Sequence, residues 1–92
     1  MFEFKKIKNI KAVNIKLQSK NLIILIGKKG YIMCGYLNLN TANKFKDVAI
    51  RVKGVLTIED VLNAKVENCS IPAKKLGIYI GQPIKEVLKI IS

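Results

Sequence analysis

The chain has 92 residues, half of them hydrophobic, a formal net charge of +11 and no histidine. This length allows one domain with a small core, and the apolar content argues against disorder. The lack of histidine excludes Ser-His-Asp and Cys-His nucleophile pairs, and two cysteines cannot complete a four-ligand zinc site in one subunit. We therefore expect neither a bound metal nor a cofactor.

The positive charge is concentrated in the first half of the chain. Residues 1–46 contain ten lysines and one acid, whereas residues 47–92 contain seven basic and five acidic residues. A basic half can attract nucleic acid. However, Arg51 is the one arginine, and arginine supplies the bidentate contacts that specific recognition prefers. Nucleic-acid binding through the N-terminal half stays an alternative, and solvated lysines on strand faces are the simpler interpretation.

Two strands are expected at the start of the chain. Residues 2–7 can form the first, followed by a turn at Lys8-Asn9. Apolar and polar residues alternate over residues 13–18, which predicts a half-buried strand. The side chains expected to face inward are Val13, Ile15 and Leu17, with Asn14, Lys16 and Gln18 facing outward.

The next run, Leu22–Ile26, is apolar on both faces, so we expect helices of the chain or a neighbouring subunit to cover each face. The sequence GKKG at 27–30 lacks the spacing and the Lys-Ser/Thr end of a P-loop. It is predicted to be a hairpin turn whose glycines adopt positive φ, with residues 31–34 as the returning strand.

After Cys34, helix caps alternate with short strands. Asn38 is expected to cap a helix over residues 39–45, with Leu39, Ala42 and Phe45 near one face. Strands are expected at 48–53 and 65–70, and further helices after Thr57, Ser70 and Pro83. The last helix has the clearest apolar stripe, formed by Ile84, Val87, Leu88 and Ile91.

These elements predict an α+β (mixed α/β) fold in a single domain over residues 1–92. Residues 1–36 are its β-rich part, whose antiparallel strands we expect to mediate oligomerisation, and residues 37–92 mix helices and strands. The longest apolar run is too short to span a bilayer, and no apolar region follows the first lysines. With its two cysteines expected to be reduced thiols, the protein is predicted to be cytoplasmic and not membrane-bound.

Cys34 is the candidate for chemistry, because it ends a strand beside Gly35 shortly before an expected helix. A helix N-terminus aimed at the sulfur would stabilise a thiolate. Gly35 would let a ligand approach closely, and Tyr31 and Tyr36 could donate hydrogen bonds to it. The candidate ligand-binding residues are therefore Tyr31, Cys34, Gly35 and Tyr36. An enzyme that uses the Cys34 thiolate is one alternative, and a buried structural cysteine is the simplest interpretation.

Three blocks of the sequence carry a family resemblance: GYIMCGYL at 30–37, GVLTIEDVLNA at 54–64 and LGIYIGQPIKEVL at 76–88. In this order they resemble DUF1805, the YunC-like family of small bacterial and archaeal proteins. The matching motif positions are Gly30, Tyr31, Ile32, Met33, Cys34, Gly35, Gly54, Thr57 and Ile58. The resemblance implies no activity, but it implies an N-terminal β-sheet region that mediates tetramerisation. We therefore expect a homo-oligomer, a tetramer, with a binding or structural role.

Overall fold

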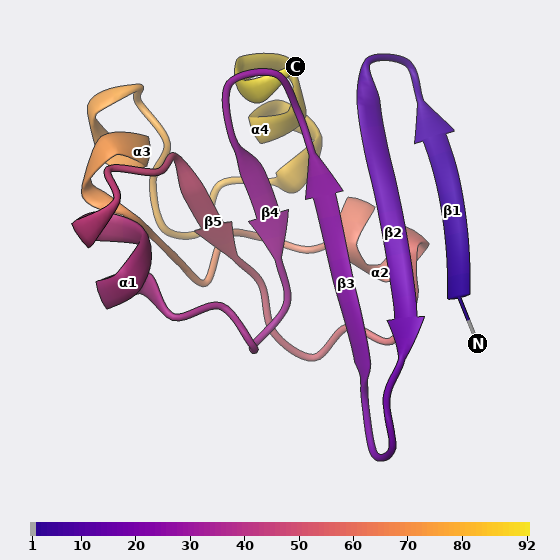
Figure 1. Ribbon diagram of the computed structural model, residues 1–92. Helices are drawn as coiled ribbons and strands as arrows, with labels where there is room; N and C mark the ends of the chain where they lie inside the picture. The colour runs from indigo at the N-terminus through magenta and orange to yellow at the C-terminus, as the bar shows by residue number, and fades with distance from the viewer. Residues whose placement is uncertain (1) are drawn as a thin grey trace.

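The computed structural model describes residues 2–92, in which six strands form one mixed sheet in chain order (Figure 1). The first four strands pair antiparallel, β4 and β5 pair parallel, and β6 returns antiparallel to β5. The strands are β1 (Phe2–Ile7), β2 (Ile10–Lys16), β3 (Asn21–Ile26), β4 (Tyr31–Met33), β5 (Ala49–Arg51) and β6 (Asn68–Cys69). Together with four short helices, this sheet confirms the α+β class.

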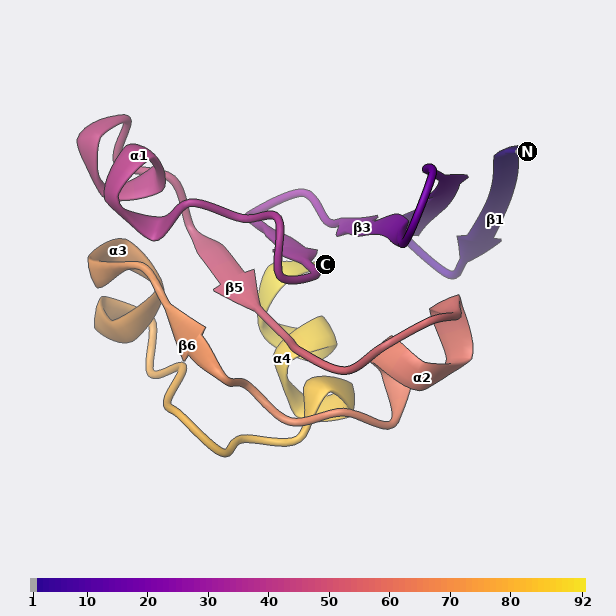
Figure 2. The same cartoon turned by 90° about the horizontal axis from the view of Figure 1, so that it is seen from below.

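The helices lie on both faces of the sheet. They are α1 (Leu39–Lys44), α2 (Ile58–Leu62), α3 (Ile71–Lys75) and α4 (Ile84–Ile91). Figure 2 shows α1 on one side of the sheet and α2, α3 and α4 on the other. Local sequence fixes the starts of α1, α2 and α3, because Asn38, Thr57 and Ser70 each accept a hydrogen bond from a backbone amide of the first turn. The caps predicted from the sequence are therefore confirmed.

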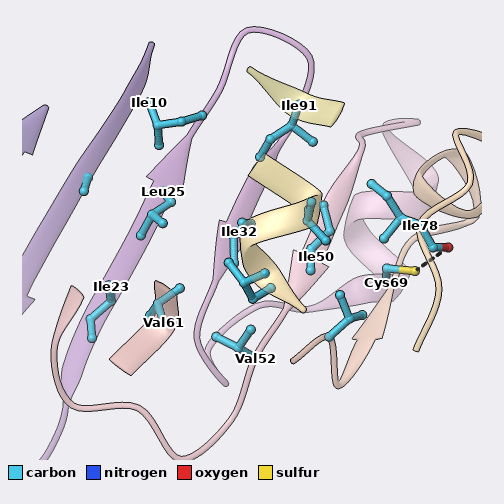
Figure 3. Close-up of a cluster of buried hydrophobic side chains, with 14 of the residues drawn as sticks. Ile10, Ile23, Leu25, Ile32, Ile50, Val52, Val61, Cys69, Ile78 and Ile91 are labelled. Carbon is cyan, nitrogen blue, oxygen red and sulfur yellow. Dashed lines mark hydrogen bonds between the residues drawn. The ribbon is translucent and has the colours of Figure 1, made fainter. Parts of the chain in front are cut away.

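The main core fills the space between the sheet and α2, α3 and α4 (Figure 3). The stripe predicted for the last helix supplies three fully buried residues, Ile84, Val87 and Ile91, with Leu88 half-buried beside them. The strands contribute Ile10, Ala12, Ile23, Leu25, Ile32 and Ile50, and Val52 joins them directly after β5. A smaller cluster beneath α1 contains Leu37, Ala42 and Ala49.

The facing predicted for the second strand is wrong. Ile10 and Ala12 are buried against the helices, and Ala12 lies opposite the fully buried Leu25 of β3. Val13 and Ile15 therefore point to the other side of the sheet, and Leu17 follows the strand and is exposed. Strict alternation identifies two faces but not which of them the helices cover.

The first three strands consequently present an uncovered apolar surface, which we call the open face. Cross-strand pairs such as Phe4 with Val13 and Val13 with Ile24 place its side chains together. No helix of residues 2–92 covers it, because α1 packs farther along the sheet, against Tyr31 and Met33 of β4 (Figure 2). The apolar side chains of the open face are Phe2, Phe4, Val13, Ile15, Leu22, Ile24 and Ile26, and the facing pair Lys6 and Lys11 lies on the same side at one end.

The turn at 27–30 is a hairpin turn, as predicted. Its two glycines do not have the predicted positive φ; they are needed because other atoms lie too close for a side chain. A Cβ at Gly27 would lie 2.4 Å from the carbonyl oxygen of Ile91, and one at Gly30 would lie 2.6 Å from Cγ1 of Val48. The amide of Lys29 donates to the same Ile91 oxygen at 2.8 Å. The turn therefore holds the C-terminal end of α4 against the sheet.

The predicted position of Phe45 is also wrong: helix α1 ends at Lys44, and Phe45 is 70 % exposed. Lys46 adopts a φ of 59°, and the amides of Lys46 and Asp47 donate to the carbonyls of Asn43 and Ala42. This is a Schellman ending, in which Phe45 is the C-cap residue and the chain reverses at Lys46 directly after it.

Within residues 2–92, no helix is both long and apolar enough to cross a membrane. In the same part of the chain, no three potential metal-ligating side chains come together.

Candidate functional site

The candidate site lies beyond the carboxyl ends of the two parallel strands. β4 and β5 run side by side, so the loops that follow them leave the sheet at the same edge. Ligands of sheets with parallel strands commonly bind at this edge. A pocket of about 730 Å³ opens here, a volume typical of small-molecule sites. Its lining residues are Ser19, Lys20, Asn21, Cys34, Gly35, Tyr36, Lys53, Gly54, Val55 and Leu56. We call it the Cys34 pocket.

Cys34 is held in the pocket wall by β3. Its amide donates to the carbonyl of Ile23 at 3.2 Å, and its Sγ donates to the carbonyl of Asn21 at 3.6 Å. Only 5 % of the residue is exposed. The Sγ therefore faces a backbone carbonyl oxygen, which is an arrangement that favours a binding contact over a thiolate nucleophile.

Two glycines keep the pocket open. A Cβ at Gly35 or at Gly54 would meet no atom within 4 Å, so each borders free space. Gly54 has a φ of 70°, which is the conformation that turns the chain after β5. Tyr36, half of which is exposed, stands beside Gly35.

The pocket offers hydrogen-bond donors at its walls. Among residues 2–92, the backbone amides of Gly35, Tyr36, Gly54 and Val55 donate to no protein acceptor. Lys20 lines the pocket as well, and no carboxylate is among its lining residues. A small polar or anionic molecule could therefore be held by backbone donors over an apolar floor.

Tyr31 is not brought to this pocket. Its hydroxyl donates to Oδ2 of Asp47 at 2.9 Å, and its ring packs in the cluster beneath α1. Burial, with the hydrogen bond and the negative charge of Asp47, raises the pKa of Tyr31 to about 12. Of the four candidates from the sequence, the structure gathers Cys34, Gly35 and Tyr36 and leaves Tyr31 in a supporting position.

The other walls of the pocket were not predicted. The turn Ser19–Asn21 and the segment Lys53–Leu56 lie far apart in the sequence. They are joined by a hydrogen bond from Nδ2 of Asn21 to the carbonyl of Leu56, at 2.8 Å. The sequence marks both segments only as turns, by Ser19 and Gly54, and nothing in either indicates the other as its neighbour.

Cys69, the second cysteine, belongs to the core. Its Sγ lies 3.9 Å from the carbonyl oxygen of Ile78, as drawn in Figure 3. Burial raises the pKa of the Cys69 thiol, and nearby Lys74 offsets this only in part. Both cysteines are free thiols. Cys69 therefore packs in the core and does not line the Cys34 pocket.

Fold and pocket together define a small α+β domain with a ligand-sized pocket at the ends of its parallel strands. The profile of the family described as a domain of unknown function, DUF1805, matches residues 33–91, which include the Cys34–Tyr36 and Lys53–Leu56 walls of this pocket. The chain belongs to this family.

Two relatives are similar over most of the chain. The uncharacterised protein YunC of Bacillus subtilis strain 168 is 40% identical over 81 residues, 84% of this chain and 80% of YunC. The crystal structure of TA1206, a protein of unknown function from Thermoplasma acidophilum, is 38% identical and superposes with a TM-score of 0.96. That match covers 100% of this chain and 94% of TA1206, so the first three strands are part of the shared fold.

Proposed function

We propose that the chain is a homo-oligomeric small-molecule-binding protein, whose subunits join through the open face and whose ligand occupies the Cys34 pocket. The observation that carries this proposal is that one hairpin supplies both features. Strands β2 and β3 form the centre of the open face, and the pocket is lined by Ser19 and Lys20 of the turn between them and by Asn21 at the start of β3. Contacts between subunits would therefore hold the pocket wall in place.

The open face supports assembly because it is apolar and uncovered. Phe2 and Phe4 are 63 % and 56 % exposed, and Ile26 is 42 % exposed. Contiguous apolar surface of this kind usually marks an interaction site. A second copy is the occupant that we infer, since the face is extended and continuous over three strands. In this account residues 1–36 form the oligomerisation part and residues 37–92 the mixed part.

The tetramer that the family resemblance implies needs a second contact besides the open face. Strand β1 pairs with β2 on one side only, so its outer edge presents free backbone groups over six residues. Such an edge can pair with the same edge of another subunit and extend the sheet. We therefore assign the two contacts of the tetramer to the open face and the edge of β1.

A binding role is favoured over the two alternatives. The Cys34 thiol donates to a carbonyl and has no histidine to activate it, which argues against a nucleophilic enzyme. The lysines of the first half lie at turns, such as Lys8 and Lys28, and on both faces of the strands, as Lys5 and Lys6 do. This scatter does not form the single basic stripe of a nucleic-acid interface. The two free thiols support a cytoplasmic location.

Alkylation tests whether the pocket admits small molecules. We expect iodoacetamide at pH 8 to modify Cys34 at least about tenfold faster than Cys69, because only Cys34 borders the pocket and burial raises the pKa of Cys69. Peptide mass spectrometry of the folded protein identifies the modified residue. Equal rates at the two cysteines would mean that the reagent enters by unfolding and not through the pocket.

A blocking variant adds the necessary control. Gly35→Phe places a ring in the free space beside Cys34 and should slow its alkylation by about tenfold, since access controls thiol reactivity. Ser92→Phe adds the same ring at the exposed C-terminal residue and should leave the rate unchanged. Should the two variants react alike, the pocket is not the route to Cys34 and the proposed binding site is withdrawn.

A further inference from the structure

A second, polar pocket lies at the start of α1, beside the end of β5 and the start of β6. Its volume is about 460 Å³, and it shares no residue with the Cys34 pocket. The lining residues are Leu37, Asn38, Leu39, Asn40, Arg51 and Asn68. Four of these six carry amide or guanidinium groups, and one of the four is Arg51, the only arginine in a chain with sixteen lysines.

Arg51, the only arginine, is fixed at this pocket. Its side chain is 23% exposed, and its Nε donates to Oε1 of Glu67 at 2.5 Å. Its Nη1 lies 3.4 Å from the carbonyl oxygen of Leu37. These contacts orient the plane of the guanidinium, and three of its five N–H donors have no acceptor among residues 2–92. A guanidinium held in this way is suited to bind a planar or tetrahedral oxyanion.

Two of the asparagines also present donors. Oδ1 of Asn38 accepts from the amide of Thr41 at 3.2 Å, and Oδ1 of Asn68 accepts from the amide of Cys69 at 2.8 Å. A backbone N–H can be bound only by the oxygen of a side-chain amide, so the orientation of both groups is determined. The Nδ2 groups of Asn38 and Asn68 are therefore the free ends.

The charges around the pocket are net positive. Glu67 is not among its lining residues, and the hydrogen bond from Arg51 lowers the pKa of Glu67, which keeps it ionised. Nζ of Lys53 lies 3.7 Å from Oε2 of the same carboxylate. Two cations thus share one carboxylate, and no acid lines the pocket itself.

We propose that this polar pocket binds a small oxyanion, a phosphate or carboxylate group, through the guanidinium of Arg51 and the Nδ2 groups of Asn38 and Asn68. This site shares no lining residue with the Cys34 pocket, although Lys53 of that pocket lies beside Glu67, the partner of Arg51. Donors from three segments converge on it: the loop before α1, the end of β5 and the start of β6. An anion would satisfy donors that have no partner among residues 2–92.

Nuclear magnetic resonance of the full-length protein labelled with nitrogen-15 tests this site. The probes are sodium phosphate and sodium acetate, each compared with sodium chloride at the same ionic strength. We expect saturable shifts of the Arg51 Nε and of the side-chain amides of Asn38 and Asn68. The anion with the tighter saturation, phosphate or acetate, gives the class of the bound group. If neither anion gives saturable shifts beyond those of chloride, the proposal is overturned.

Asn38→Asp is the decisive variant. Aspartate caps a helix as well as asparagine does, so α1 is retained, while a donor facing the pocket becomes a negative oxygen. We expect the affinity for the better anion to fall at least about tenfold, because like charge repels it at close range. Asn9→Asp makes the same charge change in the β1–β2 turn, away from the pocket, and should keep wild-type affinity. If both variants lose anion affinity equally, the loss reflects only the net charge of the protein, and the proposed site is rejected.

Discussion

Replacing Ser70 by alanine is expected to lower the free energy of unfolding by about 3 kcal/mol, since buried polar groups lose their partners. The Oγ of Ser70 donates to the carbonyl of Asp47 at 2.6 Å. The same oxygen accepts from the amides of Ala49 and Ala73, at 3.0 and 3.3 Å. Ser70 is completely buried, so water cannot replace the hydroxyl. Urea denaturation at equilibrium measures the loss.

Thr57→Ala is the matched comparison for Ser70→Ala. Thr57 also caps a helix, in a capping box with Asp60, but its hydrogen bonds are exposed. Its loss should cost only about 1 kcal/mol, the usual value for an N-cap. If Ser70→Ala costs no more than Thr57→Ala, then the hydroxyl acts only as a cap and does not link the α1–β5 loop, β5 and α3.

Replacing Gly27 by alanine should lower the free energy of unfolding by about 3 kcal/mol, the upper range for an overpacked site. The new Cβ would lie 2.4 Å from the carbonyl oxygen of Ile91 and 2.8 Å from its carbon. These are backbone atoms, so relief requires α4 to move away from the sheet. The loss of stability can be measured in the same urea experiment.

Gly35→Ala is the control for this prediction. Gly35 has no positive φ, and a Cβ there meets nothing within 4 Å. Alanine should therefore change the free energy of unfolding by no more than about 0.5 kcal/mol. A small gain in stability is also consistent, because alanine lowers the conformational entropy of the unfolded chain. An equal loss in both variants would mean that general backbone stiffening, and not contact with α4, explains the effect of Gly27→Ala.

The elements of the fold could be predicted where their signals are local. Thr57 with Asp60, and Ser70 with Pro72, mark helix starts, and the structure has helices at both positions. The facing of β2 could not be predicted, because Val13 and Ile15 are as apolar as Ile10 and Ala12 and only the packing of distant helices decides between them. Similarly, a glycine pattern does not distinguish a positive φ from the close approach of Ile91 to Gly27.

The candidate site could be predicted only in part. Cys34, Gly35 and Tyr36 adjoin one another in the sequence, so one motif identifies them, whereas Ser19–Asn21 and Lys53–Leu56 reach the pocket only through the sheet. The polar pocket had one signal that could have indicated it. A single arginine among sixteen lysines suggests a position that needs a planar, multidentate donor, and Arg51 occupies such a position.

The measurement that most directly tests the central claim, assembly through the open face, is the molar mass of the protein by light scattering during gel filtration. We expect the wild type to have a multiple of the 10.3 kDa chain mass. Ile24→Lys puts a charge in the centre of the open face and should shift the protein toward 10.3 kDa. Ile80→Lys, at a 60 % exposed position outside the open face, should keep the wild-type mass. A wild type that elutes as a 10.3 kDa monomer at micromolar concentration would contradict the account.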